Sequence, residues 1–234
     1  KKKKDDRLND AVRRVLGLKA KLNLHKKKKE RTLLKTEKEL EIVGCQEHRQ
    51  MRADAADKGI TLVKNTFDQL PIRPETHRRI RLYYLQGEVG GIMAAGPQVL
   101  DNIVAELEGR GFNVTVNDGS SRAKGPTRKY REEVDAALIF ADIVGYGAEN
   151  NYRIRWKTAM SNECPWYVHE VPTVFVSLNY TTHLHDATMV KCYINAFHNN
   201  KEVIKQVVDK IMGESKFKGT SNDLVWTNKW QAQL

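Results

Sequence analysis

Apolar residues recur along this chain in two patterns, short continuous runs and stripes at helical spacing. Residues 174–178 form the clearest run, rich in β-branched and aromatic side chains, with Pro172 before it and Asn179 after it. Such a run is typical of a strand buried on both faces. Residues 201–213 form the clearest stripe, with apolar side chains on one helical face and Gly213 as a C-terminal stop.

The other predicted elements alternate in the same way. A strand at 81–86, a helix that begins at Pro97 and a strand at 112–116 form a βαβ unit, which implies a parallel pair. Further elements are expected as strands at 60–64 and 136–144 and as helices at 128–135 and at 36–59, the last with a break near Gly44. This alternation predicts an α/β fold, a three-layer sandwich whose mostly parallel, about six-stranded sheet has helices on both faces.

The two ends of the chain fall outside this alternation. Asp5 and Asp6 can cap an amphipathic helix whose apolar side chains fall on one side, and a lysine run at 26–29 follows it. We therefore divide the chain into a helical segment, 1–35, and an α/β domain, 36–234. The apolar side of the first helix needs a partner, which could lie outside this chain. The tail 214–234 is expected to drape over the domain or dock against a neighbour.

The net charge of +11 is concentrated at the N-terminus. Residues 1–29 hold 13 Lys and Arg against three Asp, whereas the other 205 residues carry 27 basic and 26 acidic groups. A protein that tracks phosphates needs basic side chains spread along a face, so we expect no nucleic-acid partner. No apolar run approaches the roughly 18 residues of a membrane span, so no membrane partner is expected either.

Residues with metal or redox chemistry show no recognisable spacing. Cys45, Cys164 and Cys192 form no CxxC pair, and buried structural thiols are the expected reading. We expect no metal site and no cofactor. The glycines of 87–96 match neither GxGxxG nor GxxxxGK[ST], so a flexible connection is favoured, although a stand-alone nucleotide or sugar-phosphate module stays open.

Two polar stretches are candidates for a binding site. The loop 179–186, which includes Asn179 and His183, lies beyond the carboxyl end of a predicted strand, where open α/β sheets bind ligands. The stretch 145–171 contains Glu149, Arg153 and Trp156, residue types that grip a sugar by stacking on its ring and bonding its hydroxyls. The alternatives are a solvated loop with an Asx turn and a packed surface excursion.

Several segments together resemble a known family. The segments are RLNDAVRRVLGLKAKLNL, AADKGITLVKN, PTVFVSL with HLHDATMVKCYINAF, and VVDKIMGESKFKG, and they resemble the C-terminal α/β sandwich of family 3 glycoside hydrolases. RIRW followed by PWYVHEVPTVFVSLNYTTHL looks closest to the bacterial β-N-acetylhexosaminidase branch. The first helix is similar to the linker that leaves the catalytic TIM barrel in those enzymes.

The resemblance implies a retaining double displacement, with a nucleophilic Asp on a barrel that this chain lacks. No catalytic residue is then expected here, and the isolated chain should be inactive. In the β-glucosidase branch a Glu of this domain supplies the acid/base group, for which Glu149 is the candidate and Glu163 the second choice. The resemblance implies as partners the barrel of the same polypeptide and an N-acetylglucosamine-containing sugar. The implied substrate-binding residues are Glu149, Arg153, Trp156, Asn179 and His183.

The resemblance to this branch also implies a biological role and a compartment. It implies a bacterial glycosidase of carbohydrate metabolism that serves cell-wall recycling. A cytoplasmic location is favoured, with the compartment otherwise unknown.

Overall fold

The computed structural model describes residues 2–32, 34–86, 98–119, 127–143, 153–154, 156 and 164–222. The chain divides into two compact units, 1–50 and 51–234. The functional division expected between residues 35 and 36 stays a prediction. In the described part of the chain, no helix combines the length and the apolar character needed to cross a membrane.

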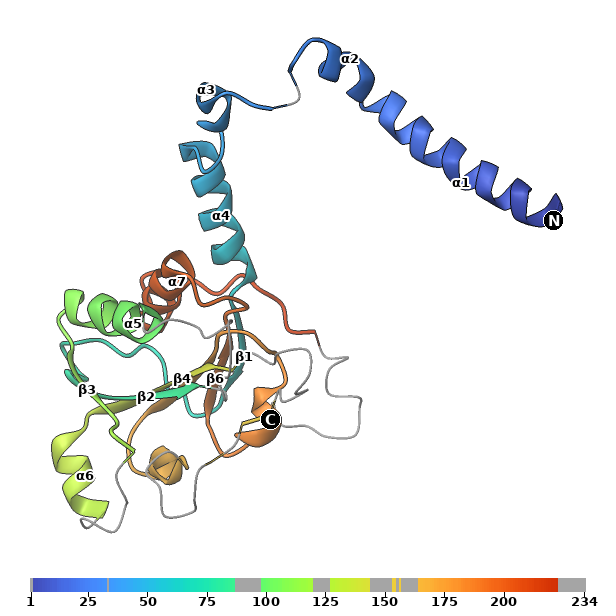
Figure 1. Cartoon of the computed structure of the whole chain (residues 1–234). Coiled ribbons are helices and arrows are strands. Elements are labelled where there is room, and N and C mark those ends of the chain that lie inside the picture. The colour runs from blue at the N-terminus through green and yellow to red at the C-terminus, as the bar shows by residue number, and fades with distance from the viewer. Residues whose placement is uncertain are drawn as a thin grey trace. The chain divides into compact units, whose positions relative to one another are not determined.

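The first unit is helical, as the amphipathic pattern predicts. It contains α1 (Lys2–Lys21), α2 (Leu24–Lys29), α3 (Glu37–Leu40) and the beginning of α4 (Gln46–Gly59) (Figure 1). Thr36 caps α3 in a capping box, because its hydroxyl accepts from the Glu39 N–H while the Glu39 carboxylate accepts from the Thr36 N–H. The break expected near Gly44 separates α3 from α4, and Gly44 has a φ of +72°.

The second unit is built on one six-stranded sheet with the order β1-β6-β5-β4-β2-β3. Among the described strands, only the β1–β6 pair is antiparallel, and the other four pairings are parallel. The βαβ unit is confirmed, since Ile80 of β2 pairs with Val114 of β3. The strands are β1 (Thr61–Asn65), β2 (Arg79–Gln86), β3 (Asn113–Val116), β4 (Ala136–Asp142), β5 (Thr173–Ser177) and β6 (Cys192–Asn195).

Hydrophobic cores lie on both faces of this sheet. Every residue of β4 is buried, and because side chains alternate along a strand, Leu138 and Phe140 enter one cluster while Ile139 and Ala141 enter the other. Figure 1 shows α5 (Gln98–Gly109) and α7 (Lys201–Ile211) over the first face and α6 (Thr127–Glu133) over the second. The second face also packs against η2 (Trp166–His169). The three-layer α/β sandwich is thereby confirmed.

A buried ion pair holds the end of α4 to α7. Lys210 is 1% exposed, and its ammonium donates to Asp57 Oδ1 at 2.7 Å and to the Lys216 carbonyl at 2.7 Å. Lys218 forms a second ion pair with Asp57. Hydrogen bonds from Lys210 first and then from Lys218 hold the pKa of Asp57 below its usual value. A charge this deeply buried is tolerated because a carboxylate, a hydroxyl and a carbonyl accept hydrogen bonds from it.

The three cysteines are free, and they differ in burial. Cys192 is buried within β6, where burial raises the pKa of its thiol. Cys45 and Cys164 are half-buried. The expected burial therefore holds for Cys192 alone.

Candidate functional site at the carboxyl edge of the sheet

The sheet changes direction between β2 and β4. The chain leaves β2 for β3 on one side, whereas it leaves β4 for β5 on the other. Open α/β sheets form a ligand crevice outside the carboxyl ends of their strands at such a point. Gln86 and Asp142, which are register partners, end the two strands there. The loops that follow, 87–97 and 144–152, lie outside the described residues, as do the two candidate acids Glu149 and Glu163.

Asp142 is the centre of the polar contacts at this edge, although it is only 2% exposed. Tyr84 donates its hydroxyl to Oδ2 at 2.6 Å, and Asn179 donates its amide to Oδ1 at 2.6 Å. Asn199 donates to Oδ1 at 3.1 Å. These four residues, which we name the Asp142 cluster, join β2, β4 and the segments that follow β5 and β6.

The carboxylate suits this position because it only accepts hydrogen bonds, and three donors converge on it. Burial, and then the neighbouring Asp142 carboxylate, raise the pKa of Tyr84, so its hydroxyl remains a donor. Asp142 lies inside a predicted apolar strand, and it is not among the predicted site residues. The available signal was a lone acid at the end of an otherwise apolar run.

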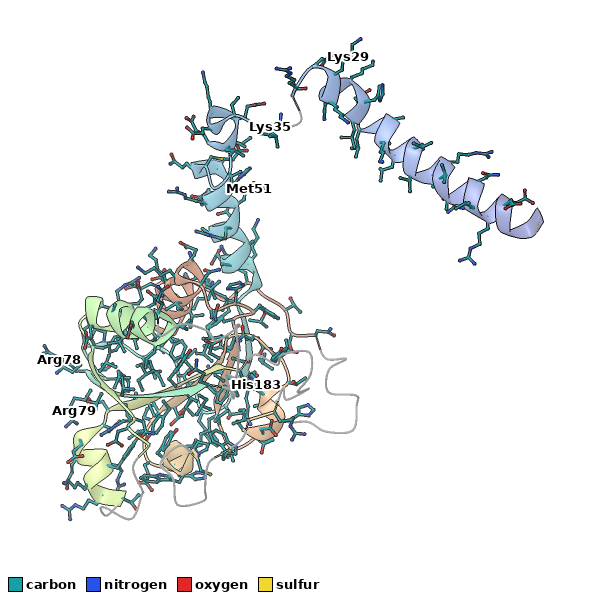
Figure 2. All side chains as sticks on the ribbon, in the orientation of Figure 1. Lys29, Lys35, Met51, Arg78, Arg79 and His183 are labelled. Carbon is teal, nitrogen blue, oxygen red and sulfur yellow. The ribbon has the colours of Figure 1, made fainter. Side chains whose placement is uncertain are left out.

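Asn179 and His183 both lie in the loop 179–186, which we name the β5 loop. The amide of Asn179 binds Asp142 and so fixes the start of the loop. His183, labelled in Figure 2, is fully buried, with its Nδ1 2.7 Å from Ser177 Oγ and its ring edge-on to Tyr180 at 5.8 Å. Both residues thus lie at the expected edge of the sheet, and their contact with a substrate stays a prediction.

Arg153 and Trp156 converge on the other end of the β5 loop, at the short helix η3 (His183–Asp186). Arg153 Nε lies 2.8 Å from both carboxylate oxygens of Asp186, and Trp156 donates its Nε1–H to the Asp186 carbonyl at 3.0 Å. The Ile154 N–H donates to the same carboxylate at 3.0 Å. The structure therefore brings Arg153, Trp156 and the β5 loop together, and their contact with a sugar stays a prediction.

Arg153 and Asp186, at the other end of the β5 loop, form an ion pair. Burial raises the pKa of Asp186, but hydrogen bonds from Arg153 and from the Ile154 N–H outweigh burial, and the net pKa is lowered. Arg153 remains 68% exposed while it binds Asp186, so part of its guanidinium faces solvent. Asp142 and Asp186 are both engaged by donors, which suits them to hold loops rather than to attack a substrate.

These features first define a class of protein: an open α/β sandwich that fixes polar loops at the carboxyl edge of its sheet. No family model matches the chain. A β-N-acetylglucosaminidase/β-glucosidase from Cellulomonas fimi is 30% identical over 233 residues, which cover 98% of this chain and 41% of that protein. The chain spans about two fifths of the length of that relative.

Solved structures agree with this match. A β-glucoside phosphorylase, BglX, is 28% identical with a TM-score of 0.75, over 92% of this chain and 38% of that one. A fungal multi-domain GH3 β-N-acetylglucosaminidase shares the fold, with 18% identity and a TM-score of 0.52 over 81% of this chain and 20% of that one. These comparisons match the chain to the C-terminal α/β domain of glycoside hydrolase family 3 proteins. The resemblance found in the sequence is thereby confirmed.

Proposed function

We propose that this chain is the non-catalytic C-terminal domain of a retaining glycoside hydrolase that acts on β-N-acetylglucosaminides. In this role it braces a TIM barrel of the same polypeptide and lends the β5 loop to the rim of the sugar site. The observation that carries the proposal is the match of 98% of the chain to 41% of a β-N-acetylglucosaminidase/β-glucosidase. The unmatched part of that relative leaves room for a catalytic domain.

The contacts at the carboxyl edge support the rim role. A retaining glycosidase needs a nucleophilic carboxylate and an acid/base group roughly 5 Å apart. Among the described residues at this edge, Asp142 accepts from three donors and Asp186 pairs with Arg153, so both serve to position loops. A loop fixed at both ends can present side chains to a substrate at a small entropic cost.

Activity of the isolated chain tests the catalytic half of the proposal. We expect no release of nitrophenol from 4-nitrophenyl N-acetyl-β-glucosaminide by residues 1–234, because half of a double displacement cannot proceed without its nucleophile. The longer polypeptide that the proposal requires should release it. Turnover by the isolated chain would overturn the assignment of the nucleophile to a barrel.

Kinetics of the longer polypeptide test the proposed role of Arg153 at the rim of the sugar site. Arg153→Met should lower kcat/KM by about 10-fold or more, because it removes the guanidinium that holds Asp186 and faces the rim. Arg128→Met is the matched control, since Arg128 also pairs with a carboxylate, Glu132, but on the exposed surface of α6. Equal kinetics for the two variants would exclude a role for Arg153 at the rim.

The β-glucosidase branch is an alternative in which Glu149 supplies the acid/base group. In that case Glu149→Gln should lower kcat by about 100-fold or more on a substrate with a poor leaving group. If the acid/base group lies on the barrel, the same variant should change kcat far less. The two outcomes separate the branches.

A second candidate is phosphorolysis, which the BglX match favours because that protein is a β-glucoside phosphorylase with a TM-score of 0.75 to this chain. In phosphorolysis, phosphate rather than water takes the glycosyl group from the enzyme. Phosphorus NMR of the reaction of the longer polypeptide should then show a glycosyl phosphate, whereas hydrolysis gives the free sugar alone. The same domain architecture is compatible with both outcomes.

A further inference from the structure

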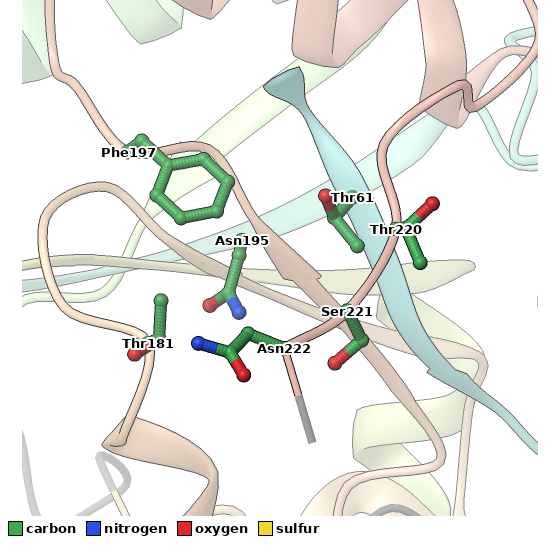
Figure 3. A pocket seen from close by; sticks show the side chains of 7 residues that line it. All are labelled: Thr61, Thr181, Asn195, Phe197, Thr220, Ser221 and Asn222. Atoms are coloured by element: carbon green, nitrogen blue, oxygen red, sulfur yellow. The ribbon is translucent and has the colours of Figure 1, made fainter. Parts of the chain in front are cut away.

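A cavity lies at the carboxyl end of β6, two strands away from the switch between β2 and β4. The cavity has a volume of about 140 Å³, and its walls come from the start of β1, the β5 loop, the end of β6 and the segment 220–222 (Figure 3). All of these parts belong to the unit 51–234. Its lining residues are Thr61, Thr181, Asn195, Phe197, Thr220, Ser221 and Asn222.

The side chains that line the cavity carry no formal charge, and most of them bear a polar group on an otherwise apolar surface. Three threonines, a serine and two asparagines offer hydroxyl and amide groups, and Phe197 contributes the single aromatic ring among the seven lining residues. Charged ligands are matched by opposite charges in most sites, so a lining of this kind selects a neutral ligand. Groups that both donate and accept favour hydroxyls on that ligand.

Asn195 places in the wall of the cavity a buried hydrogen-bond acceptor that has no partner among the described residues. Its side chain is 4% exposed, and within the described part of the chain its Oδ1 has no hydrogen-bond partner. Leaving such an acceptor unsatisfied costs about 1–3 kcal/mol. Figure 3 shows this amide directed toward Asn222, another lining residue. A ligand hydroxyl satisfies the amide whichever of its two atoms faces the cavity, because a hydroxyl donates and accepts.

The wall formed by Phe197 is strained. Phe197 has a φ of +65°, a left-handed conformation that costs a bulky L-residue roughly 1–2 kcal/mol. Strained residues of this kind persist where the surroundings fix them, and they cluster at ligand sites. The strain keeps a half-exposed aromatic ring beside the polar groups. An apolar ring face next to hydroxyl and amide groups matches the two faces of a sugar ring.

The opposite wall is held tightly to the sheet. A Cβ added at Gly219 would lie 2.6 Å from the Gly59 carbonyl oxygen and would also collide with the side chain of Thr61. Only glycine permits this close approach. The segment that follows it is therefore fixed against β1, and the cavity is part of the folded unit.

We propose that this cavity is a second binding site, separate from the Asp142 cluster, for a neutral polyhydroxylated ligand no larger than one pyranose ring. The size agrees, because a cavity of about 150 Å³ accommodates a six-membered ring such as benzene. It also exceeds the roughly 30 Å³ that one water occupies. The site needs no barrel, so its test is independent of the proposed function.

The isolated chain, labelled with ¹⁵N, tests the site directly by NMR titration with N-acetylglucosamine and with glucose. We expect saturable shifts of the Asn195 and Thr220 signals with a Kd of about 1–10 mM, as suits a small neutral ligand. Glucose 6-phosphate should bind no more tightly than glucose, because the lining offers no cation. Tighter binding of the phosphate would overturn the neutral-ligand assignment. An absence of shifts at roughly 50 mM sugar would show that the cavity holds water alone.

Two variants and one control localise the binding. Asn195→Leu should weaken it about 10-fold or more, since it removes the amide while keeping a similar side-chain volume. If that variant fails to fold, Thr220→Val replaces an exposed hydroxyl with a group of the same shape and should weaken binding about 3-fold or more. Asn113→Leu, on the exposed start of β3, is the control. Unchanged affinity in the folded cavity variants would overturn the proposal.

Discussion

Asp142 and Lys210 are charged residues buried almost completely, and each is tolerated for the same reason. Donors from three other residues surround Asp142, and a carboxylate, a hydroxyl and a carbonyl surround Lys210. A buried charge without such partners would cost several kcal/mol. At the scale of the residue, polar groups in this protein thus serve as fixed joints between segments far apart in the sequence.

Replacing Asp142 should reveal how much its cluster contributes. Asp142→Ala leaves three donors without their acceptor, so the free energy of unfolding should fall by about 3 kcal/mol. Tyr84→Phe removes one donor and should cost only about 1 kcal/mol. Urea unfolding followed by circular dichroism measures both values. Equal losses for the two variants would show that the carboxylate does not join the segments.

The Asp57–Lys210 pair predicts how stability depends on pH. The pKa of Asp57 is depressed in the folded chain, so its contribution is present above its unfolded pKa of about 3.9 and is lost as the pH falls through the folded value. Asp57→Ala should therefore lower the free energy of unfolding by about 3 kcal/mol at neutral pH, and by progressively less below about pH 4.

Urea unfolding of both proteins at several pH values measures this difference. Lys218→Ala is the matched control, because Lys218 pairs with the same carboxylate from an exposed position. It should cost less than about 1 kcal/mol. A difference between wild type and Asp57→Ala that does not change with pH would contradict the pKa argument.

At the scale of the element, β4 organises the sheet. Its seven residues are all buried, and the six apolar ones that precede Asp142 alternate between two hydrophobic clusters. The apolar run alone predicts such a strand, because only a central strand of a sheet covered on both faces can bury every side chain. The antiparallel partner of β6 is β1, which the run itself could not reveal, since pairing depends on contacts between distant segments.

Truncation of β4 side chains should be far more costly than truncation at the edge. Phe140→Ala should lower the free energy of unfolding by about 3–5 kcal/mol, because it leaves a cavity in the first cluster. Val116→Ala, on the edge strand β3 and about one third exposed, should cost less than about 1 kcal/mol. Calorimetric unfolding of the two variants measures the contrast. Similar losses would mean that β4 is not at the centre of the fold.

The same elements show how far sequence patterns reach into the site. The apolar run before Asn179 predicts that this residue lies beyond β5. The run does not predict the hydrogen bond from Asn179 to Asp142, because that bond is a single side-chain contact between two strands. The contacts of Arg153 and Trp156 with Asp186 likewise depend on the tertiary structure. Their residue types indicate sugar chemistry, whereas the geometry that brings them together depends on how the segment before η2 returns to the sheet.

At the scale of the whole chain, both hydrophobic clusters consist of residues from the unit 51–234. Apolar side chains of α1, among them Leu8, Val12 and Leu16, are exposed, so they add no buried area to either cluster. The free energy that stabilises the α/β fold therefore comes from the second unit.

Removing residues 1–35 should leave that fold intact. The fragment 36–234 should unfold within about 1 kcal/mol of the whole chain, because no residue of either cluster is lost. Urea unfolding of the two proteins at equal concentration measures this. A loss above about 2 kcal/mol would show that the first helices stabilise the α/β unit.

The outer strands of the described sheet have one more consequence. β3 has four residues and β1 has five, and the register of β1 shifts between Leu62 and Lys64, where the Lys64 ammonium turns in to bind the Thr188 carbonyl at 3.0 Å. Short, irregular edge strands pair poorly with a strand of another chain. Concentrated solutions of the protein should consequently resist fibril formation, and a lengthened, regular β1 would be the change that invites it.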